Sequence, residues 1–484
     1  MTFKRYFLPI AMAALLTACG RTVTITQIDI IPEPVFQVQK EGSYTLNRNV
    51  AVAVSGLGQN SPTAKYIMNS LRHAHLRPSL VAWSEESDIE LIVNDTMNPE
   101  LGDEGYLLEV RQTGIRLSAN TETGLFYAYQ SFTQMIPADV LERTYSSIIL
   151  PECTILDYPR FAWRGVYLEA NRQLFPVKTI KKYLDLMANY KLNRFHWELP
   201  DSTALTAMDG NIDSVENEQE SNNYYSSEEI DEVIAYAASL GIKVVPGDGT
   251  AILWDDGTET SLIPRKEGEV VAARNSLQAG QKAARAGNRV VMCPDEYCRL
   301  DYYQADRRYQ PLASDGLITL AKAYQFNPAP QGTNKYVEQC ILGGQCNLWA
   351  EHIETSTQAE YMLLPRLLAM SECLWSPEEV KNWSHFRKKV ELQKIRLNCK
   401  GYTYCEGSFT PLFSATRVDD HSMNIAIETE MPSTYIFYTT DGSTPTRRSS
   451  IYLGPINLKR GTHIKIQPVY KDQERDSVYE FIIK

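Results

Sequence analysis

The sequence predicts an α/β fold in which an incomplete parallel barrel of the TIM (β/α)8 type lies between a small α+β domain and a C-terminal β-sandwich. Three observations predict it. Through the middle of the chain, short apolar runs typical of buried strands alternate with segments of helical periodicity. Two of these runs are joined by very few residues, which leaves the barrel incomplete. From about Arg417 onward, Thr, Tyr and Ile alternate between tight turns at Asp441-Gly442 and Arg460-Gly461, as in a sandwich.

Length and charge set the broad organisation. A chain of 484 residues is expected to form about two to four domains. We expect a signal peptide over residues 1–18, an α/β domain over 19–155, the truncated barrel over 156–405 and the sandwich over 413–484. The formal net charge is −11 and no basic stripe is evident, which argues against a nucleic-acid partner.

The first twenty residues predict export and lipid anchoring. Lys4 and Arg5 precede the apolar run Phe7 to Leu16, which is too short to anchor the chain across a bilayer. The tetrapeptide Leu16-Thr17-Ala18-Cys19 resembles a bacterial lipoprotein cleavage box, and Cys19 would then carry the lipid. We therefore expect the protein in the bacterial cell envelope, held on the membrane at the periplasmic side or the outer surface. The alternative is an ordinary cleaved signal in which Cys19 is incidental.

Eight further cysteines include three close pairs: Cys293/Cys298, Cys340/Cys346 and Cys399/Cys405. An exported protein could join such pairs as disulfides, although buried free thiols fit the pattern equally well. No pair has His partners at the spacing of a zinc site. We expect no metal site and no cofactor.

The segment from Ser202 to Ser227 carries a partial calcium-loop pattern. Acidic and amide side chains stand at the loop spacing: Asp209, Asn211, Asp213 and Glu220. Ser214, however, occupies the position where such a loop needs Gly for its turn. We therefore expect a solvated loop.

Residues Asp157 to Asp201 form the predicted start of the barrel. Gly165 to Glu169 is expected to be a strand, Val177 to Asn189 a helix, and Arg194 to Leu199 the next strand. Polar side chains follow both strands: Glu169, Asn171 and Arg172 after the first, Glu198 and Asp201 after the second. Because the carboxyl ends of barrel strands share one face, we expect a ligand to bind there.

The remaining elements follow in order. Ahead of the barrel we expect a hairpin over 105–110 and 114–118 and a helix over 124–135. A capping box at Ser226 and Glu229 predicts a helix that ends at Leu240. Further strands are predicted over 242–246, 251–256, 269–273, 289–293 and 341–351, with a helix over 278–286.

Four residues, Gly247 to Thr250, are all that separate two of these predicted strands. Neighbouring parallel strands need a crossover of roughly a dozen residues. A short Gly-rich join makes only a hairpin or a bend. We therefore expect residues Ile242 to Asp256 to form an antiparallel pair or one bent strand, and the barrel to have fewer than eight parallel strands.

Two motifs carry a resemblance to a known family. D-Y-P-R-F-A-W-R-G, from Asp157, and N-R-F-H-W-E-L-P-D, from Asn193, resemble the opening of the catalytic barrel of family 20 glycoside hydrolases, the β-N-acetylhexosaminidases. The domains before and after the barrel also resemble those of the family. Family members carry an H-x-G-G-D-E motif on the fourth strand, in which Asp orients the substrate acetamide as nucleophile and Glu is the general acid and base. This chain contains no such motif, so no catalytic residue is assigned.

The resemblance implies a set of substrate-binding residues at family positions. Arg164 would grip two sugar hydroxyls, Trp349 would form the aromatic floor, and Trp254 one wall of the acetamide pocket. Asp301 and Glu351 would accept hydrogen bonds from the outer hydroxyls, and Asp201 completes the set. A structural role is the alternative for each, such as a core position for Trp349 or a buried ion pair between Arg164 and Asp201 or Glu351.

Three functions remain open. The sequence favours a lipid-anchored protein that recognises glycans containing N-acetylhexosamine, with lost or severely reduced hydrolysis. The first alternative is an active, retaining and substrate-assisted β-N-acetylhexosaminidase that uses a displaced carboxylate, for which Glu198, Asp255 and Asp256 are the candidates. The second is a poorly folded remnant.

Overall fold

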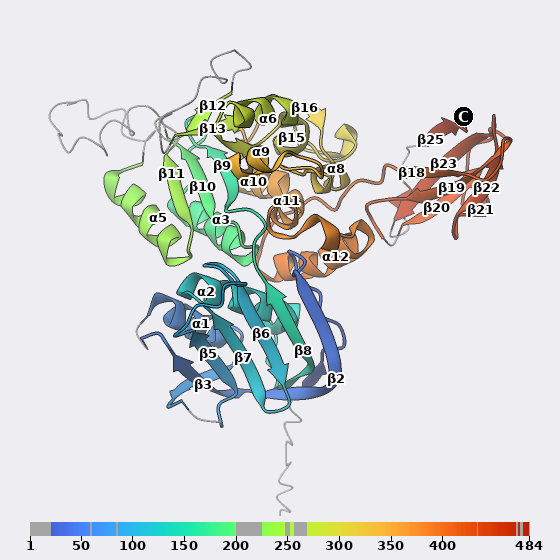
Figure 1. Cartoon of the computed structure of the whole chain (residues 1–484). Helices are drawn as coiled ribbons and strands as arrows, with labels where there is room; N and C mark the ends of the chain where they lie inside the picture. The colour runs from blue at the N-terminus through green and yellow to red at the C-terminus, as the bar shows by residue number, and fades with distance from the viewer. Residues whose placement is uncertain are drawn as a thin grey trace, which may run out of the picture.

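The computed structural model describes residues 21–58, 61–83, 86–199, 225–246, 252–255, 269–432, 434–470, 473–474 and 478–483. Figure 1 shows the N-terminal sheet, in blue, below the barrel strands, in green and yellow, with the C-terminal sheets, in red, to one side. The barrel sheet therefore contacts a second domain at one end and leaves its other end away from it.

The N-terminal domain is an eight-stranded sheet with two helices packed on it. Its strand order is β1-β8-β6-β7-β5-β3-β4, with β2 paired to β8. The predicted hairpin is the antiparallel pair β6 and β7, and the predicted helix is α2, which begins after the N-cap Thr121. The elements are β1 (Thr22–Thr24), β2 (Phe36–Asn47), β3 (Asn49–Ser55), α1 (Pro62–His73), β4 (Arg77–Val81), β5 (Ile89–Val93), β6 (Tyr106–Arg111), β7 (Gly114–Ala119), α2 (Glu122–Met135), η1 (Ala138–Leu141) and β8 (Ser147–Asp157).

The barrel sheet has seven described strands, all parallel, in the order β11-β10-β9-β17-β14-β13-β12. Their positions match the predicted strands to within a few residues, and the capping box of Ser226 and Glu229 opens α5 as expected. The elements are β9 (Trp163–Glu169), α3 (Val177–Asn189), β10 (Arg194–Glu198), α5 (Ser227–Ser239), β11 (Lys243–Pro246), β12 (Ile252–Trp254), β13 (Val270–Ala273), α6 (Leu277–Arg285), β14 (Arg289–Met292) and β17 (Ile341–Leu348). In the described residues the sheet is therefore an incomplete barrel.

The predicted pairing across the short join is wrong. Within the described part of the chain, β11 and β12 form the two opposite edges of the sheet, and neither is hydrogen-bonded to the other. The prediction assumed that consecutive strands are neighbours, whereas the chain passes from one edge of an open sheet to the other. Six Cα–Cα steps separate Pro246 from Ile252 and reach at most about 20 Å, which exceeds the gap of about 10 Å left by one absent strand. The expectation of fewer than eight parallel strands holds for the described residues.

Shorter elements and helices complete the barrel domain. β17 approaches β9 closely at Gly343, where φ is +142°. A Cβ there would come within 2.0 Å of the Trp163 carbonyl oxygen, so the close approach requires glycine. The remaining elements are α7 (Asp295–Cys298), β15 (Tyr302–Tyr303), η3 (Arg307–Tyr309), β16 (Ser314–Leu317), α8 (Leu320–Tyr324), α9 (Lys335–Cys340), α10 (Ser356–Leu363), α11 (Arg366–Trp375), η4 (Glu378–Val380) and α12 (Trp383–Cys399).

The C-terminal strands form two antiparallel sheets, as expected for a small sandwich. Three strands pair in the order β18-β19-β22, and β21-β20-β23-β24 form the second sheet with β25 paired to β23. Their shared core is built from isoleucines: Ile425, Ile427, Ile436, Ile464, Ile466 and Ile483. The strands are β18 (Leu412–Arg417), β19 (Ser422–Glu428), β20 (Tyr435–Thr439), β21 (Ser450–Ile451), β22 (Ile456–Lys459), β23 (His463–Tyr470), β24 (Gln473–Glu474) and β25 (Tyr479–Ile482).

Two buried ion pairs hold the N-terminal domain against the amino end of the barrel. Arg164, at the start of β9, pairs with Glu104, and Lys191, just before β10, lies 2.8 Å from a carboxylate oxygen of Asp157. The side chains of Arg164, Lys191 and Asp157 are completely buried. A single apolar core runs through both domains. The carboxyl ends of the strands are therefore the ends left for a ligand.

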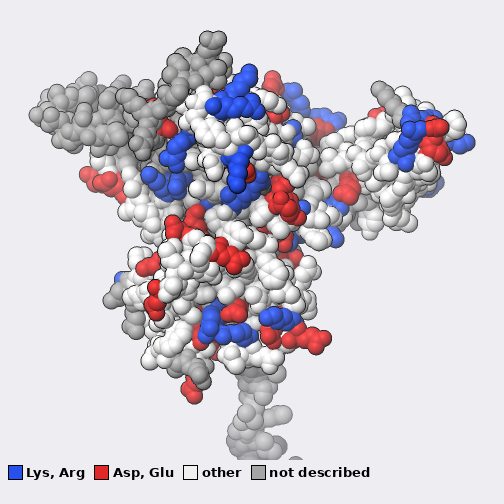
Figure 2. Space-filling model, viewed as in Figure 1, with Lys and Arg blue, Asp and Glu red and all other residues white. Residues whose placement is uncertain are grey.

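Several expectations from composition can be compared with the described residues. The eight cysteines after Cys19 are free thiols, so the three close pairs are not joined here. Among the described helices, none is both long and apolar enough to cross a membrane. Basic and acidic side chains are interspersed on the face shown in Figure 2, and the described residues there form no continuous basic band.

Candidate functional site

Side chains from neighbouring strands meet inside the barrel sheet toward its carboxyl end. Since alternate residues of a barrel strand point inward, Tyr167 on β9, His196 on β10 and Asn347 on β17 face one another. Gln345 Nε2 lies 3.2 Å from His196 Nδ1 and 3.1 Å from Asn347 Oδ1. These residues form a buried polar layer beneath the strand ends.

An aromatic cluster joins Tyr167 and His196 of this polar layer to the two tryptophans at the strand ends. The Tyr167 ring centroid is 4.6 Å from that of Trp349 and 5.2 Å from that of Trp254. His196 stacks on Trp254 at 5.5 Å with an interplanar angle of 17°. Trp254 and Trp349, both half-buried, are themselves 5.5 Å apart. The structure thus brings together the two tryptophans that were predicted to contact a sugar, on either side of Tyr167.

Tyr167 connects the aromatic cluster to a carboxylate. Its hydroxyl donates a hydrogen bond of 2.7 Å to Oε2 of Glu198, at the end of β10. Burial, the charge of Glu198 and this hydrogen bond raise the pKa of Tyr167 far above its usual value. Tyr167 therefore stays neutral and acts as a hydrogen-bond donor that orients Glu198.

Glu169 ties together the ends of β9 and β17. One carboxylate oxygen accepts a hydrogen bond of 2.7 Å from the Ala350 backbone N–H, and the other lies 3.2 Å from Arg172 Nε. Ala350 stands between Trp349 and Glu351. This places Arg172, with an exposed side chain, on the same rim as the predicted floor and acceptor.

Trp349 is bordered by a cation and has an unsatisfied polar atom. The Arg274 guanidinium lies 5.4 Å from the Trp349 ring centroid. The buried Nε1 of Trp349 has no hydrogen-bond acceptor among the described residues. Glu351, two residues further along, is exposed.

Asp301 is buried, and both of its carboxylate oxygens already have partners within the protein. Both of its oxygens lie 3.2 Å from Arg299 Nε, and Oδ2 also accepts a hydrogen bond of 2.6 Å from Ser314. Arg299 reaches Asp295 as well, at 3.7 Å. Asp301 therefore orders the segment after β14, and its carboxylate is already used within the protein.

The predicted role of Arg164 needs a correction. Its guanidinium lies at the amino end of β9, opposite the expected binding face, and is fully buried. All five N–H donors are used within the protein: by Glu104 twice, and by Lys191, Phe161 and Tyr127. The alternative of a buried ion pair is correct in kind, but the partner is Glu104 rather than Asp201 or Glu351. Arg164 joins two domains and does not grip a sugar.

Some predicted residues lie outside the described part of the chain. They are Cys19, Asp201, Asp256 and the calcium-like positions Asp209, Asn211, Asp213 and Glu220. Within the described residues, no group of three or more His, Cys, Asp or Glu side chains could hold a metal ion.

Comparison with models of known protein families shows to which family this chain belongs. The model of "Glycosyl hydrolase family 20, catalytic domain" matches residues 161–250 and 247–378, and that of "Glycosyl hydrolase family 20, domain 2" matches 27–158. The chain belongs to glycoside hydrolase family 20. A third model, "Fn3 associated", matches residues 425–483. The family 20 catalytic match falls in two segments that meet at 247–250, which is the join between β11 and β12.

Curated family 20 relatives share the same name. A beta-hexosaminidase of Porphyromonas gingivalis is 24% identical over 577 residues, covering 91% of this chain and 73% of the relative. A beta-hexosaminidase of Vibrio furnissii is 28% identical, covering 71% of this chain and 76% of the relative. Because the first alignment is longer than the 484 residues of this chain, the relative contains segments that this chain lacks.

Solved family 20 structures share the fold. An N-acetyl-beta-hexosaminidase of Streptomyces plicatus, solved with Thio-NAglucal, superposes with a TM-score of 0.65 at 21% identity, covering 79% of this chain and 97% of that chain. A beta-N-acetylhexosaminidase of Bacteroides fragilis gives a TM-score of 0.63 at 21% identity, covering 78% and 97%.

Three residues of this family 20 chain near the carboxyl end of β9 were not assigned a role from sequence. Glu169 ends the strand and Arg172 lies just beyond it, whereas Tyr167 is buried in the layer beneath. The signal was present, since Glu169 and Arg172 follow a predicted strand. Two arginines, Arg164 and Arg172, flank that strand, and only the one after it can reach the binding face.

Proposed function

We propose that this family 20 chain binds glycans containing N-acetylhexosamine at the carboxyl face of its barrel and hydrolyses them at a severely reduced rate or not at all. The observation that carries the proposal is that, among the described residues, no strand lies between the two sheet edges β11 and β12. The family resemblance places the catalytic Asp-Glu pair on the strand that would lie between these edges. The names of the relatives support the class of ligand.

The binding half of the proposal rests on the rim. Trp349 and Trp254 offer aromatic faces, and Arg172 offers a fork of N–H donors. Glu351 is an exposed acceptor two residues after Trp349. Together they supply the apolar surface, the donors and the acceptor that a sugar ring with hydroxyl and acetamide groups requires.

The second part of the proposal, the severely reduced hydrolysis, rests on the groups that cleavage of a glycosidic bond requires. The leaving oxygen must receive a proton from a positioned acid, and the acetamide needs a group that orients it as nucleophile. Proton transfer alone contributes roughly a hundredfold to ten-thousandfold in rate. Without the Asp-Glu pair of the fourth strand, both contributions are missing at the family positions.

Two observations favour the second candidate, a displaced acid. Glu198 is oriented by Tyr167, and Asp255 is buried immediately after Trp254 at the end of β12. Either carboxyl group would have to reach the glycosidic oxygen of a sugar held on the rim. An active hexosaminidase built on one of them is therefore the alternative to the binding protein.

Two variants distinguish these functions. Binding of N-acetylglucosamine is measured by calorimetry and hydrolysis by release of a chromogenic β-N-acetylglucosaminide, for the native chain, Glu198→Gln and Asp255→Asn. We expect native binding with hydrolysis near the buffer background, unchanged in both variants. Hydrolysis at ordinary enzyme rates that is lost in one variant would establish the displaced acid instead, and an absence of sugar binding would refute the recognition function.

We also propose that the chain is anchored to the cell envelope by a lipid on Cys19. The proposal is supported by the order of charge, apolar run and small residues before Cys19 in the sequence. Changing Cys19 to Ala should leave the precursor unprocessed or release the protein from the membrane fraction. An unchanged mature mass and an unchanged membrane fraction in the variant would remove the lipid anchor.

A further inference from the structure

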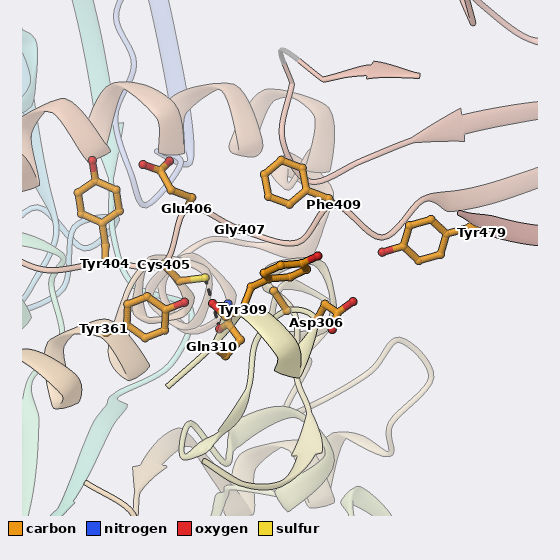
Figure 3. A pocket seen from close by; sticks show the side chains of 11 residues that line it. Asp306, Tyr309, Gln310, Tyr361, Tyr404, Cys405, Glu406, Gly407, Phe409 and Tyr479 are labelled. Atoms are coloured by element: carbon orange, nitrogen blue, oxygen red, sulfur yellow. Dashed lines mark hydrogen bonds between the residues drawn. The ribbon is translucent and has the colours of Figure 1, made fainter. Parts of the chain in front are cut away.

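Two cavities of the protein differ in whether their charged side chains have partners. The smaller, of about 170 Å3, lies beside the sandwich and is drawn in Figure 3. Its acid Asp306 is paired with the Arg308 guanidinium, which also lies 5.5 Å from the ring centroid of Tyr309. The larger, of about 510 Å3, is lined by a lysine that has no such pair. We therefore looked to the larger cavity for a site that takes a charged ligand.

The larger cavity, called the joint cavity from here on, lies where the N-terminal domain meets the barrel. Figure 1 shows α1 and α2 below α3 and α5, and all four helices contribute residues to the lining. The last turn of α12 and Tyr402 complete it. Its volume falls within the range of roughly 300–1,000 Å3 that is typical of ligand pockets. None of its lining residues belongs to the sugar site at the barrel rim.

Two cations at the end of α12, Arg396 and Lys400, line the joint cavity. Arg396 Nη2 donates hydrogen bonds of 3.2 Å to the Gln134 carbonyl and 2.8 Å to the Ile136 carbonyl, at the end of α2. Within the described part of the chain, the ammonium group of half-buried Lys400 makes no hydrogen bond and no ion pair. Lys400 is therefore a charged donor that lacks an acceptor.

The other charged side chains of the joint cavity leave this positive charge unbalanced. Asp185 of α3 is the one carboxylate among the described lining residues, and its Oδ1 already accepts a hydrogen bond of 2.7 Å from the Tyr236 hydroxyl. Lys182 is paired with a carboxylate outside the cavity. Lys400 and Arg396 thus face a single carboxylate, and this excess of positive charge favours an anion.

The pKa of Lys400 agrees with this balance. Burial and the charge of Arg396 lower the pKa of Lys400 to about 8 from an ordinary 10.5, and Asp185 opposes them only in part. An anion beside Lys400 favours its protonated form. The affinity for an anion should therefore be lost as the pH rises through about 8.

We propose that the joint cavity binds a small molecule through a phosphate or carboxylate group held between Lys400 and Arg396. This site is independent of the sugar site of the proposed function and shares no residue with it. A ligand there contacts α1 and α2 on one side and α3 and α5 on the other, so binding should stabilise the contact between the two domains.

The site is tested with the full chain and three sugars that differ in charge: glucose 6-phosphate, glucuronate and uncharged glucose. We expect calorimetry at pH 7 to show binding of an anionic sugar that exceeds any binding of glucose. Lys400→Met keeps the apolar stem and should weaken this binding about tenfold or more. Lys388→Met, at an exposed lysine of the same helix outside the cavity, is the matched control and should bind like the native chain.

A second variant should act in the opposite direction. Asp185→Asn removes the negative charge and keeps an oxygen that can accept the Tyr236 hydrogen bond, so the affinity for the anion should rise severalfold. A general loss of structure weakens binding and does not produce such a gain. An affinity in Asp185→Asn that falls as far as in Lys400→Met would contradict the proposal.

The pH dependence is a third measure. Between pH 7 and pH 9 the affinity of the native chain should fall, and Lys400→Met should remove this fall. His73→Gln, which removes the other lining group that gains a charge near neutral pH, should keep it. Burial raises the pKa of the lining tyrosines above its ordinary value, so they stay neutral in this range: Tyr66, Tyr129, Tyr236 and Tyr402.

The remaining outcomes decide the class of ligand. Binding of glucose 6-phosphate alone or of glucuronate alone supports the site and identifies phosphate or carboxylate as the recognised group. The proposal is refuted if neither anion binds at millimolar concentration, if glucose binds as tightly as both, or if Lys400→Met and Lys388→Met bind alike. None of these results depends on Trp349, so this site and the sugar site at the rim stand or fall separately.

Discussion

Arg164 Nη2 lies 2.7 Å from Oε1 of Glu104, and this buried ion pair joins the first barrel strand to the N-terminal domain. Burial alone would raise the pKa of Glu104, but the charge of Arg164 and the hydrogen bonds from Arg164 and Asn193 outweigh it and lower the pKa. The pair therefore stabilises the fold above the unfolded-state pKa of a glutamate and loses that contribution as the pH falls through the lower folded-state value.

A substitution of Glu104 should affect stability and leave sugar affinity unchanged. In Glu104→Gln the buried charge of Arg164 loses its counter-charge, and we expect a loss on the order of 3 kcal/mol in the free energy of unfolding by urea. Glu232→Gln, which removes an exposed partner of Lys181, is the control and should cost less than about 1 kcal/mol. A tenfold loss of sugar affinity in folded Glu104→Gln would contradict this, and would show that Arg164 contributes to sugar binding.

Arg172 should behave in the opposite way. Because it lies on the rim beside Glu169 and Ala350, Arg172→Ala should weaken N-acetylglucosamine binding about tenfold, with little change in thermal stability. Arg143→Ala, at a comparably exposed arginine of the N-terminal domain, is the control. Equal affinities of the two variants, measured by calorimetry, would exclude Arg172 from the site.

Trp349 should contribute most of the apolar contact. Trp349→Ala removes the ring that packs on Tyr167 and Trp254, and should cost on the order of 1–3 kcal/mol of binding, or about tenfold to a hundredfold in affinity. Trp83→Ala, at a half-exposed tryptophan of the N-terminal domain, is the control and should bind normally. An affinity of Trp349→Ala for the sugar that equals that of the native chain and of Trp83→Ala would contradict this placement.

The raised pKa of Glu372 predicts that its contribution to the free energy of unfolding rises as the pH falls toward 5. This buried carboxyl on α11 accepts hydrogen bonds from the Tyr324 hydroxyl and the Glu33 backbone N–H and faces Lys389 and the Glu33 carboxylate. Burial raises its pKa to about 7 from an ordinary 4.5, and Lys389 only partly opposes this. A raised pKa stabilises the fold below the unfolded-state value, and the contribution is lost as the pH rises through about 7.

The matching experiment compares unfolding at several pH values. Between pH 8 and pH 4 this one group should add on the order of 3 kcal/mol to the free energy of unfolding, opposed at the acid end by pairs such as Arg164 and Glu104. Glu372→Gln should flatten the slope between pH 5 and 8. An identical slope in the variant and the native chain would assign the pH dependence to other groups.

Much of the fold could be predicted because local sequence signals agree with the final packing. The helix α3 begins and ends where its apolar spacing predicts, and α5 forms behind the capping box of Ser226. The relation of β11 to β12 could not be predicted in this way. A short join limits the distance between two strand ends but does not state whether the strands are neighbours or the two edges of an open sheet.

The site could be predicted only in part. Trp254 and Trp349 converge because Trp254 ends β12 and Trp349 directly follows β17, at the same face of the parallel sheet. Arg164 was misplaced because a family motif identifies a residue without giving its depth along the strand, and its true partner, Glu104, is 60 positions away in another domain. Likewise, the pairing of Asp301 with Arg299 and Ser314 depends on how the segment after β14 folds back.

The most direct test of binding without cleavage is a single-turnover experiment. The full chain is held in large excess over a chromogenic β-N-acetylglucosaminide, at a concentration at which calorimetry shows the sugar to be bound, so that the release of the chromophore measures the chemical step alone. We expect release within about tenfold of the buffer rate, since a missing general acid alone removes roughly a hundredfold to ten-thousandfold. Release of the bound substrate on the order of once per second or faster, as in ordinary enzymes, would contradict the proposal.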